Sequence, residues 1–435
     1  MAPDRDRASS IGPRSMSAPS EAASERRWLI PDAVFDGVAR REGVGVLIER
    51  GRVSALAPVA QIGDSDCPVE HLSGLTLGPG FVDTHVHVTL GTGSRSYETV
   101  MREDSDARML LRAVKNGLEH LAVGVTTMRD CGGRGRTTFE LTEAIRAGLL
   151  HAFPEVQASG RPITITGGHF HWCGEEADGP VGARTAVRRM VKDGADFIKV
   201  MASGGGTKGT WLGHASFTVE ELRAIVDESH RHGRLTTVHC LATRSIENAV
   251  EAGFDSIEHC GFQRADGVVE FDPDVGRRLV DAGIWYSPTI QTGYRRMLHC
   301  QEAHERAPDE TTRRALDTVT AKVEGQIEVV ARMLDLGARI VMGTDAIATF
   351  GDYAVGLELQ VRAGMSPLQA MRSATANAAA SIGLADHAGR IAVGRTADVV
   401  AFEGDPTYDI GAAGCVRAVW RRGLPVSTNS RLFRQ

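Results

Sequence analysis

The sequence predicts an α/β protein, in which a (β/α)8 barrel of the TIM type carries a small β-sandwich domain built from both ends of the chain. Three observations predict this fold. Short apolar or β-branched runs alternate with helical stretches through the middle of the chain, eight such runs are present, and apolar and polar residues alternate near both termini. Alternating strands and helices form βα units with a parallel sheet, and eight units are the number found in a barrel.

The first 27 residues are expected to form a disordered leader. They are rich in Ser, Ala, Arg and Pro, and they contain no apolar stretch of the length that a secretory signal peptide needs. A mitochondrial leader is the alternative. The acidic residues Asp4, Asp6, Glu21 and Glu25 count against it, because such leaders are poor in acidic residues.

The sandwich domain is predicted at residues 28–77 and 390–430, where the residue pattern is that of a half-buried sheet. Its strands are expected at Trp28–Phe35, Val44–Glu49, Val53–Leu56, Ala397–Phe402 and Val416–Gly423. Two unrelated sheets that flank the barrel are the alternative interpretation.

The barrel domain is predicted at residues 78–389. Its eight strands are expected at Phe81–Val88, Gly124–Met128, Glu155–Ala158, Phe197–Met201, Leu235–His239, Ser256–His259, Ile284–Ser287 and Arg339–Met342. End signals mark the helices between them. A capping box at Thr218 opens a helix that runs to His232, and Ser366 followed by proline begins an Ala-rich helix towards Ile382.

Composition excludes several classes of function. With 49 Lys and Arg against 55 Asp and Glu, the chain of 435 residues has a formal charge of −6 and lacks the basic surplus of a nucleic-acid-binding protein. No stretch approaches the ~20 apolar residues of a membrane helix. The seven cysteines are widely spread without a CxxC pair, which indicates a reducing compartment. We therefore expect a cytoplasmic protein that binds neither nucleic acid nor membrane.

Two histidines on the first barrel strand have the spacing of a chelate. His85 and His87 lie two residues apart, so on a strand both imidazoles project from one face, together with Asp83. Burying three polar groups costs several kcal/mol unless they coordinate or hydrogen-bond something. A single pair of this kind is more often structural than metal-binding, so it does not establish a site by itself.

The same feature recurs on later strands. Lys199, His239, His259 and Asp345 each lie at, or just after, the carboxyl end of a predicted strand. In a barrel these strand ends converge on one mouth, where the loops carry the chemistry. We therefore expect these four residues and the two histidines of the first strand to meet at one point.

Nitrogen and oxygen donors without cysteine suit Zn²⁺ or a similar divalent ion. Four histidines and an aspartate exceed what one tetrahedral ion requires, which suggests two ions about 3.5–4 Å apart that share ligands. Cys240 and Cys260 directly follow two of the proposed ligands and point the other way on their strands. We expect them to be small buried apolar residues.

An ordered set of motifs covers nearly the whole chain after about residue 28. It comprises Gly78-Pro-Gly-Phe-Val-Asp-Thr-His-Val-His87, Gly124-Val-Thr-Thr-Met-Arg-Asp130, Asp196-Phe-Ile-Lys-Val-Met201, Val238-His239, Ser256-Ile-Glu-His259, Gly343-Thr-Asp345 and Gly394-Arg-Thr-Ala-Asp398. This set resembles the amidohydrolase superfamily, in particular its imidazolonepropionase-like and metal-dependent dipeptidase (prolidase)-like branch.

The resemblance implies a binuclear metal centre. By that resemblance one ion binds His85, His87 and Asp345, the other binds His239 and His259, and Lys199, carboxylated by carbon dioxide, bridges the two. A carbamate is an anion with two oxygens that offsets the charge of two cations, whereas an ammonium would repel them. The alternative is a mononuclear site in which Lys199 pairs with an acid such as Asp83.

The expected reaction is hydrolysis. The ions would lower the pKa of a bridging water from about 15.7 towards ~7 and polarise the substrate carbonyl. Asp345 would orient the resulting hydroxide, take its proton during attack and pass it to the leaving nitrogen.

The loops after the strands carry the expected substrate contacts. The family often has Gly-Gly-His where this chain has Gly167-Gly-His169, so His169 is the candidate for contacting the substrate carbonyl or the oxyanion. An exposed loop histidine is the alternative, and it is the favoured interpretation for His171. Further pocket candidates are His214, Trp211, Gln291 and Tyr294.

This chain departs from the family pattern after the fifth-strand histidine. Many relatives continue with Ala-His-Gly or Ala-Tyr, whereas here Cys240-Leu241-Ala242-Thr243-Arg244 follows. Leu241 replaces a polar substrate contact, so a dipeptide substrate does not follow from the resemblance. Arg244 is the candidate that would replace the lost contact by bidentate pairing with a carboxylate.

We therefore predict a metal-dependent hydrolase that cleaves a C–N bond in an amide, peptide or related small molecule. A cyclic amidohydrolase or deaminase with one ion is the alternative within enzymes. A non-catalytic barrel scaffold is the alternative from another class, but it predicts damaged ligand positions, and all six are present. Homodimers are common in the family, so a homo-oligomer is possible.

Overall fold

The computed structural model describes residues 26–63, 65–91, 93 and 95–426. The leader predicted at residues 1–27 lies outside the described residues except for its last two, and Arg27 already begins the first strand. The last residues of the predicted sandwich domain, 427–430, also lie outside them.

Strands from both ends of the chain form one sheet of eight strands, in the order β18-β17-β16-β5-β1-β3-β4 with β2 paired to β1. They are β1 (Arg27–Phe35), β2 (Arg40–Glu42), β3 (Val44–Glu49), β4 (Arg52–Pro58), β5 (Val69–Pro79), β16 (Val399–Glu403), β17 (Val416–Arg421) and β18 (Leu424–Val426). Antiparallel pairing of β5 with β16 joins the two ends. The strands predicted near both ends of the chain therefore belong to one hydrogen-bonded sheet, and not to two unrelated sheets. Sequence analysis did not predict β5, which Ser73 and Gly74 interrupt, and this strand makes the connection.

All eight strands predicted for the barrel are present. They are β6 (Phe81–Val86), β7 (Val125–Asp130), β8 (Glu155–Ala158), β11 (Ile198–Met201), β12 (Thr236–Ala242), β13 (Ser256–Gln263), β14 (Trp285–Ser287) and β15 (Arg339–Ile340), with the additional short strands β9 (Ile163–Thr164) and β10 (Glu175–Glu176). They form two parallel sheets, β6-β7-β8 and β10-β9-β11-β12-β13-β14-β15.

Backbone hydrogen bonds link the edges of these two parallel sheets. The amide of Asp345 donates to the carbonyl of His85 at 2.8 Å, and the amide of Asp196 donates to the carbonyl of Ala158 at 2.9 Å. This is the arrangement of a TIM-type fold, in which the carboxyl ends of the strands face the same way.

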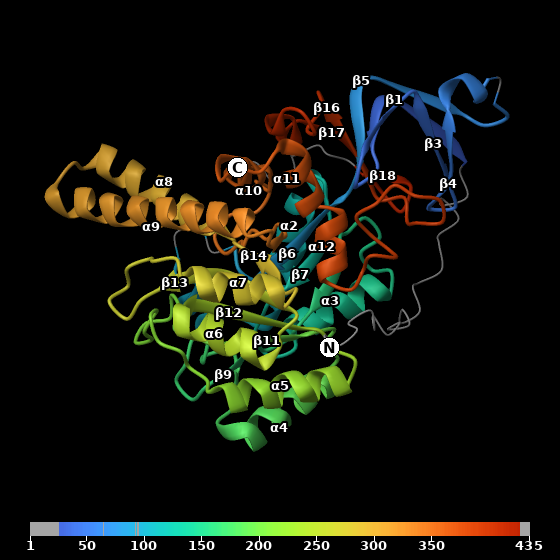
Figure 1. Cartoon of the computed structure of the whole chain (residues 1–435). Coiled ribbons are helices and arrows are strands. Elements are labelled where there is room, and N and C mark those ends of the chain that lie inside the picture. The colour runs from blue at the N-terminus through green and yellow to red at the C-terminus, as the bar shows by residue number, and fades with distance from the viewer. Residues whose placement is uncertain (1–25, 64, 92, 94, 427–435) are drawn as a thin grey trace.

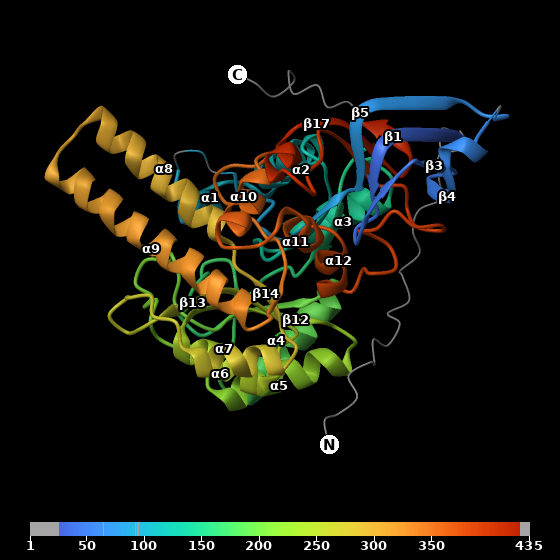
Figure 2. The same ribbon diagram turned by 45° about the horizontal axis from the view of Figure 1, so that its top comes forward.

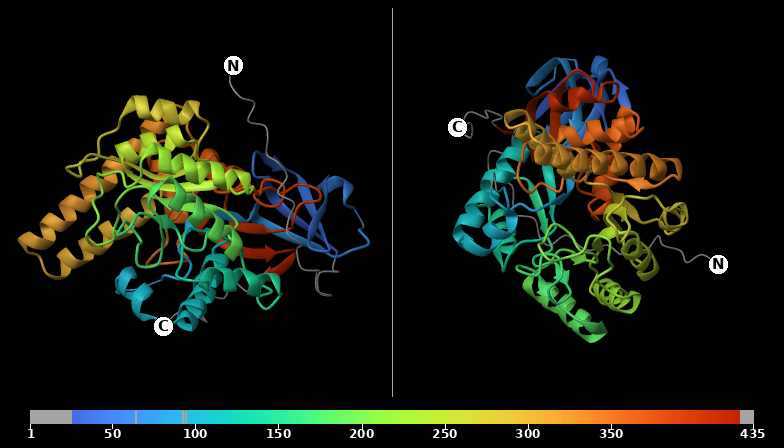
Figure 3. Two further views of the ribbon diagram at one scale, coloured as in Figure 1. Left: turned by 90° about the horizontal axis from the view of Figure 1, so that it is seen from below. Right: turned by 90° about the vertical axis from the view of Figure 1, so that its left-hand side faces the viewer.

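The helices lie around these strands, and α8 and α9 form a hairpin that extends away from them (Figures 1 and 2). Figure 3 shows this hairpin and the terminal sheet on opposite sides of the molecule. The helices are α1 (Tyr97–Glu103), α2 (Asp106–Ala122), α3 (Thr137–Arg146), α4 (Gly179–Asp193), α5 (Val219–Arg231), α6 (Thr243–Ala252), α7 (Pro273–Asp281), α8 (Ile290–Arg306), α9 (Glu310–Asp335), α10 (Ala354–Arg362), α11 (Pro367–Ser373) and α12 (Ala376–Ser381), with 3-10 turns η2 (Val59–Gln61) and η3 (Ile410–Gly414). None of the described helices has the length and apolarity needed to cross a membrane.

The predicted helix signals are correct at the start of α5 and only partly correct at α11. Thr218 and Glu221 form the predicted capping box. The Ala-rich helix predicted to run from Ser366 is instead two helices, α11 and α12. Thr375 lies between them with φ −130° and ψ −99°, and its hydroxyl donates to the carbonyl of Met371. A threonine that hydrogen-bonds back to its own helix favours such a break.

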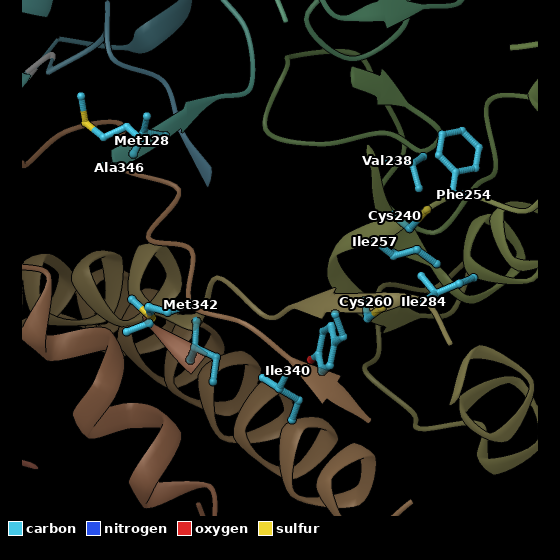
Figure 4. Packing of buried hydrophobic residues seen from close by; sticks show 14 of the residues in the cluster. Met128, Val238, Cys240, Phe254, Ile257, Cys260, Ile284, Ile340, Met342 and Ala346 are labelled. Carbon is cyan, nitrogen blue, oxygen red and sulfur yellow. The ribbon is translucent and has the colours of Figure 1, made fainter. Parts of the chain in front are cut away.

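Cys240 and Cys260 lie in the hydrophobic core, as predicted. Both are buried and free, and Figure 4 shows them close to Val238, Ile257 and Ile284. Because alternate residues of a strand face opposite sides, packing these thiols into the core turns the preceding histidines of β12 and β13 inward.

Candidate active site

His85, His87 and Asp345 lie together at the carboxyl ends of β6 and β15. Oδ1 of Asp345 is 3.5 Å from Nε2 of His85 and 3.6 Å from Nε2 of His87. One ligand atom from each of the three buried residues lies within 4.8 Å of the other two. Two imidazole nitrogens and a carboxylate oxygen at this separation are able to hold one divalent ion.

Hydrogen bonds orient both imidazoles for such a role. Nδ1 of His85 donates to the carboxylate of Glu258 at 2.9 Å, and Nδ1 of His87 donates to the carbonyl of Gly132 at 2.9 Å. Because a carbonyl oxygen only accepts, the ring proton of His87 lies on Nδ1, and the carboxylate of Glu258 favours the same tautomer in His85. The Nε2 lone pairs are then directed at the space beside Asp345.

His239 and His259 form a second pair next to the first. Their ring centroids are 4.5 Å apart, and the His259 ring is 5.2 Å from that of His85. Nε2 of His239 donates to the carbonyl of Gly204 at 3.0 Å, which leaves Nδ1 as its acceptor. Nδ1 of His259 contacts the hydroxyl of Thr289, and this hydroxyl donates its own proton to the carbonyl of Pro288. Nδ1 of His259 is therefore the donor to Thr289, and the lone pair of its Nε2 is left for another ligand.

Lys199 on β11 lies beside these four histidines, which we call the histidine cluster. Its side chain is 1% exposed, and its Nζ has no hydrogen-bond partner. No ion pair among the described residues includes it. Burial is the main cause that lowers the pKa of His85 and His239, and the charge of Lys199 acts in the same direction. A buried amine without a partner is costly. This unpartnered nitrogen therefore fits a site that is completed by a modification and by bound cations.

The ionisation of the cluster also fits metal ligands. Burial lowers the pKa of His87 to about 4 and that of His239 to about 3, and it lowers the pKa of His85 and His259 well below the usual value. These imidazoles are therefore neutral, which is the form that binds metal. Burial raises the pKa of Asp345 to about 7, although Lys199 acts in the opposite direction. A nearby cation would be needed to keep this carboxylate ionised at lower pH.

Three residues at the site have backbone angles that are rare outside glycine. The φ angles of His259, Asp345 and Thr289 are 69°, 51° and 49°. Left-handed conformations in non-glycine residues cost about 1–3 kcal/mol each and cluster at functional sites.

His169 lies against the histidine cluster. It is 5% exposed, its ring centroid is 4.7 Å from that of His239, and its Nδ1 contacts the hydroxyl of Thr207 at 2.8 Å. A Cβ atom at Gly205 would lie 2.3 Å from Nε2 of His169, so glycine at this position is what gives the ring its space.

The other predicted substrate contacts are not joined to the cluster by hydrogen bonds, ion pairs or ring contacts of the described residues. Trp211 and His214 are exposed and pack on each other, with ring centroids 4.9 Å apart. Arg244 is exposed and pairs with Glu247 at 2.8 Å. Gln291 is buried and donates to Asp352. Tyr294 packs against the core, and His171 is half-buried.

The alternative in which Lys199 pairs with Asp83 is wrong. The Asp83 carboxylate accepts from the amide of His85 at 3.1 Å and from the amide and hydroxyl of Thr344 at 3.0 and 2.7 Å. Asp83 therefore positions the strand ends that carry His85 and Asp345, and Nζ of Lys199 has no partner.

Sequence analysis missed Glu258, which is fully buried and joins several parts of the site. It accepts from His85, from Arg129 at 2.6 Å and from Thr237. A carboxylate in the middle of a buried strand, directly before a proposed ligand, was the available signal.

An aromatic wall, formed by Tyr97, Phe170 and Trp172, was also missed. The Phe170 ring lies 5.0 Å from that of His87, 5.8 Å from Tyr97 and 4.6 Å from Trp172. The residues of the aromatic wall come from different segments of the chain, α1 and the loop after β9, so no local sequence pattern predicts this wall.

A parallel barrel with histidines and an aspartate at its strand ends defines the class of metal-dependent barrel hydrolases. The chain belongs to the amidohydrolase family, whose model matches residues 76–426. It is therefore a metal-dependent hydrolase that acts on carbon–nitrogen bonds.

Several characterised proteins are similar to this chain. An ochratoxinase from Aspergillus niger is 29% identical over 378 residues, which cover 80% of this chain and 75% of the relative. An imidazolonepropionase from Deinococcus deserti is 24% identical over 91% of this chain and 94% of its own length. The crystal structure of an Xaa-Pro dipeptidase with bound methionine superposes with a TM-score of 0.79 at 26% identity, covering 92% of this chain and 100% of that one.

Proposed function

We propose that this chain hydrolyses an amide or peptide bond of a small molecule at a binuclear metal centre. One observation carries the proposal: the unpartnered, buried Nζ of Lys199 lies beside the histidine cluster, in which His85, His87 and Asp345 offer ligand atoms within 4.8 Å of one another. A structural cluster would satisfy such an amine with a carboxylate.

The proposed ligands divide into two sets. His85, His87 and Asp345 would hold one ion, and His239 and His259 the other. The nitrogen and oxygen donors favour Zn²⁺. Lys199 would bridge the two sets as a carbamate, formed when its neutral Nζ bonds to the carbon of carbon dioxide and releases one proton.

Divalent ions in this cluster would supply Lewis-acid polarisation of the scissile carbonyl and would lower the pKa of water. Asp345 would take the proton of the attacking water. The water oxygen bonds to the carbonyl carbon, the C–N bond breaks, and Asp345 returns the proton to the leaving nitrogen. His169 would donate a hydrogen bond to the carbonyl oxygen as negative charge develops on it.

The chemistry of the site indicates a class of substrate rather than one particular compound. Similarity to an Xaa-Pro dipeptidase supports a peptide or amide bond. The aromatic wall of Tyr97, Phe170 and Trp172 beside His87 offers an apolar surface for a ring or branched group. The cytoplasmic location and the homo-oligomer stay predictions.

The test is a hydrolysis screen of the metal-loaded protein across N-acyl amino acids, dipeptides, carbamates, ureas and lactams, with metal analysis of the same sample. We expect close to two ions per chain, release of a free amine from an amide or peptide, and loss of turnover after chelation. Undiminished turnover after exhaustive chelation would refute the proposal.

A mononuclear cyclic amidohydrolase or deaminase is the second candidate, and similarity to an imidazolonepropionase favours it. One ion per chain, with turnover of lactams only or release of ammonia, would support this candidate over the first.

A further inference from the structure

A glycine-rich loop, Ser203-Gly-Gly-Gly-Thr207, follows β11 and packs against the candidate active site. The carbonyl of Gly204 accepts a hydrogen bond from Nε2 of His239 at 3.0 Å. A Cβ atom at Gly205 would lie 2.3 Å from Nε2 of His169, so the backbone of the loop lies directly against this ring. The loop therefore contacts both a proposed metal ligand and the candidate for binding the substrate carbonyl.

The last residue of this loop, Thr207, joins two neighbouring residues of the site through one hydroxyl group. Thr207 is 2% exposed, and its Oγ1 lies 2.8 Å from Nδ1 of His169. The same oxygen accepts a hydrogen bond from the amide of Phe170 at 3.1 Å. Phe170 has a φ of 63°, which is rare outside glycine, and its ring lies 5.0 Å from that of His87. One hydroxyl thus contacts the carbonyl-binding candidate and the backbone of the aromatic wall.

The contact between Thr207 and His169 allows two directions of donation. In the first, Nδ1 of the imidazole donates to Oγ1, and in the second the hydroxyl donates to Nδ1. A hydroxyl group has one proton to donate and is able to accept two hydrogen bonds, so the bond from Phe170 leaves both directions open. The first direction would leave the hydroxyl proton of Thr207 unbonded unless another group accepts it.

No other group among the described residues accepts this proton. Oγ1 of Thr207 makes its hydrogen bonds with His169 and Phe170 alone in this part of the chain. The phenol of Tyr97 lies nearby, since burial raises its pKa to about 12 and Thr207 acts in the opposite direction. The hydroxyl of Tyr97 nevertheless has no hydrogen-bond partner where the structure describes the chain. Because a buried donor left unbonded costs free energy, the second direction is favoured.

This direction decides which nitrogen of His169 carries the ring proton. Because Nδ1 accepts, it has no proton, and the imidazole is neutral with its proton on Nε2. Nε2 makes no hydrogen bond with the described residues and is not one of their enclosed, unpartnered atoms, so part of its surface stays open. A protonated Nε2 is able to donate to a carbonyl oxygen that gains negative charge, whereas an unprotonated Nε2 would present a lone pair to that oxygen.

We propose that Thr207 is a positioning residue, whose hydroxyl fixes the ring proton of His169 on Nε2 and so makes His169 the hydrogen-bond donor to the scissile carbonyl. It acts through His169 rather than on the substrate. The role in hydrolysis rests on the proposed function, whereas the position of the ring proton does not.

The first test reads the position of the ring proton and requires no turnover. The whole chain is labelled with isotopic nitrogen in its histidines and loaded with zinc, and long-range proton–nitrogen correlation spectra show which ring nitrogen of each histidine is protonated. The signals of His169 are assigned by their loss in His169→Gln. We expect a protonated Nε2 and an unprotonated Nδ1. A protonated Nδ1 in the wild type would overturn the inference, whatever the hydrolysis screen shows.

Variants test the part that the hydroxyl plays. Thr207→Val keeps the shape of the side chain but removes the hydroxyl, so a measurable share of His169 should carry its proton on Nδ1, and an unchanged spectrum would refute the inference. Thr207→Ser keeps the hydroxyl and should keep the wild-type spectrum. Tyr97→Phe should also leave the ring proton of His169 in place, and its movement to Nδ1 or away from Nε2 would show that Tyr97 shares the role. If Thr207→Val does not fold, the wild-type spectrum still decides.

Kinetics test the consequence for catalysis, with the best amide substrate of the hydrolysis screen. Thr207→Val should lower kcat about five- to tenfold, as expected for the loss of one hydrogen bond. KM should change less than about twofold, because the donor acts on charge that develops in the transition state. Thr207→Ser should restore most of the lost kcat. Equal kcat in Thr207→Val and the wild type would refute the positioning role.

Thr185→Val on α4 is the matched control. Thr185 is exposed and its hydroxyl donates to the carbonyl of Val181 at 3.0 Å, so this variant removes the same group outside the site and should keep the wild-type kcat and spectrum. Failure of the two proposals is distinguishable. A wild type that hydrolyses nothing, but whose protonated Nε2 depends on the Thr207 hydroxyl, would refute the proposed function and support the assignment of the ring proton.

Discussion

Replacing Lys199 with methionine is expected to stabilise the metal-free protein and to remove the stabilisation that metal ions provide. In the absence of ions the buried Nζ has no partner, and methionine keeps most of the apolar stem while removing the amine. A buried polar group left without a hydrogen bond costs about 1–3 kcal/mol, so the metal-free variant should gain about that much unfolding free energy.

With metal ions present the sign reverses. Ions that bind only the folded state at a free concentration 100 times their dissociation constant add about 2.7 kcal/mol each. Methionine cannot form the bridging carbamate, so at least one ion should be lost together with its share of this stability. The wild type should therefore be the more stable protein with zinc and the less stable one with chelator.

The assay is urea unfolding of both proteins, in chelator and in a zinc buffer at fixed free zinc, followed by far-UV circular dichroism. Lys322→Met on α9 is the matched control. Lys322 is half-buried, and burial lowers its pKa, but it lies outside the histidine cluster. Its substitution should change stability equally in both buffers. If Lys199→Met binds two ions per chain and shows the same zinc-dependent gain as the wild type, the bridging role of Lys199 is refuted.

Three other outcomes are expected. Asp345→Asn should lower kcat by about 10²–10⁴-fold while keeping at least one ion by elemental analysis, and near-normal kcat in the metal-loaded variant would reject its acid–base role. Gly205→Ala should displace His169, because the added Cβ would lie 2.3 Å from Nε2. The value of kcat/KM should then fall at least about tenfold while the metal content stays unchanged, which kinetics and elemental analysis test together. Glu228, whose pKa the hydrogen bond from Arg188 lowers to about 2, is more acidic in the folded state than its ordinary value of 4.5. Its contribution to stability is therefore complete above about pH 4.5 and disappears as the pH falls towards 2; urea unfolding of metal-free protein at pH 3 and pH 6 should show a smaller loss in Glu228→Gln than in the wild type.

The barrel strands were the most predictable part of the fold. Each is a short run that helix signals separate from the next, and β6, β7, β11, β12 and β13 are fully buried, so the local pattern identifies these strands without knowledge of their neighbours. Strand β5 was missed because Ser73 and Gly74 interrupt its apolar pattern, although pairing with β1 and β16 compensates for them. The break at Thr375 was missed for a similar reason: alanine-rich sequence favours helix on both sides, and one side-chain hydrogen bond decides the boundary.

The candidate metal ligands were predictable because, on a strand, the position of a residue in the sequence determines the direction in which its side chain points. His85 and His87 share a face by their spacing of two, and strand ends share a mouth in a parallel barrel. The loop residues had no such rule. Trp211, His214 and Arg244 follow the strands in sequence, but their side chains are exposed, because loop conformation depends on what the loop packs against.

The sequence by itself thus determined which residues offer nitrogen and oxygen donors and on which strand ends they stand. Only the tertiary structure decided that Nζ of Lys199 has no partner and that Glu258 orients His85. The physical reason is that a donor is specified by its residue type and local periodicity, whereas its partner comes from a distant segment and is specified only when the whole core packs.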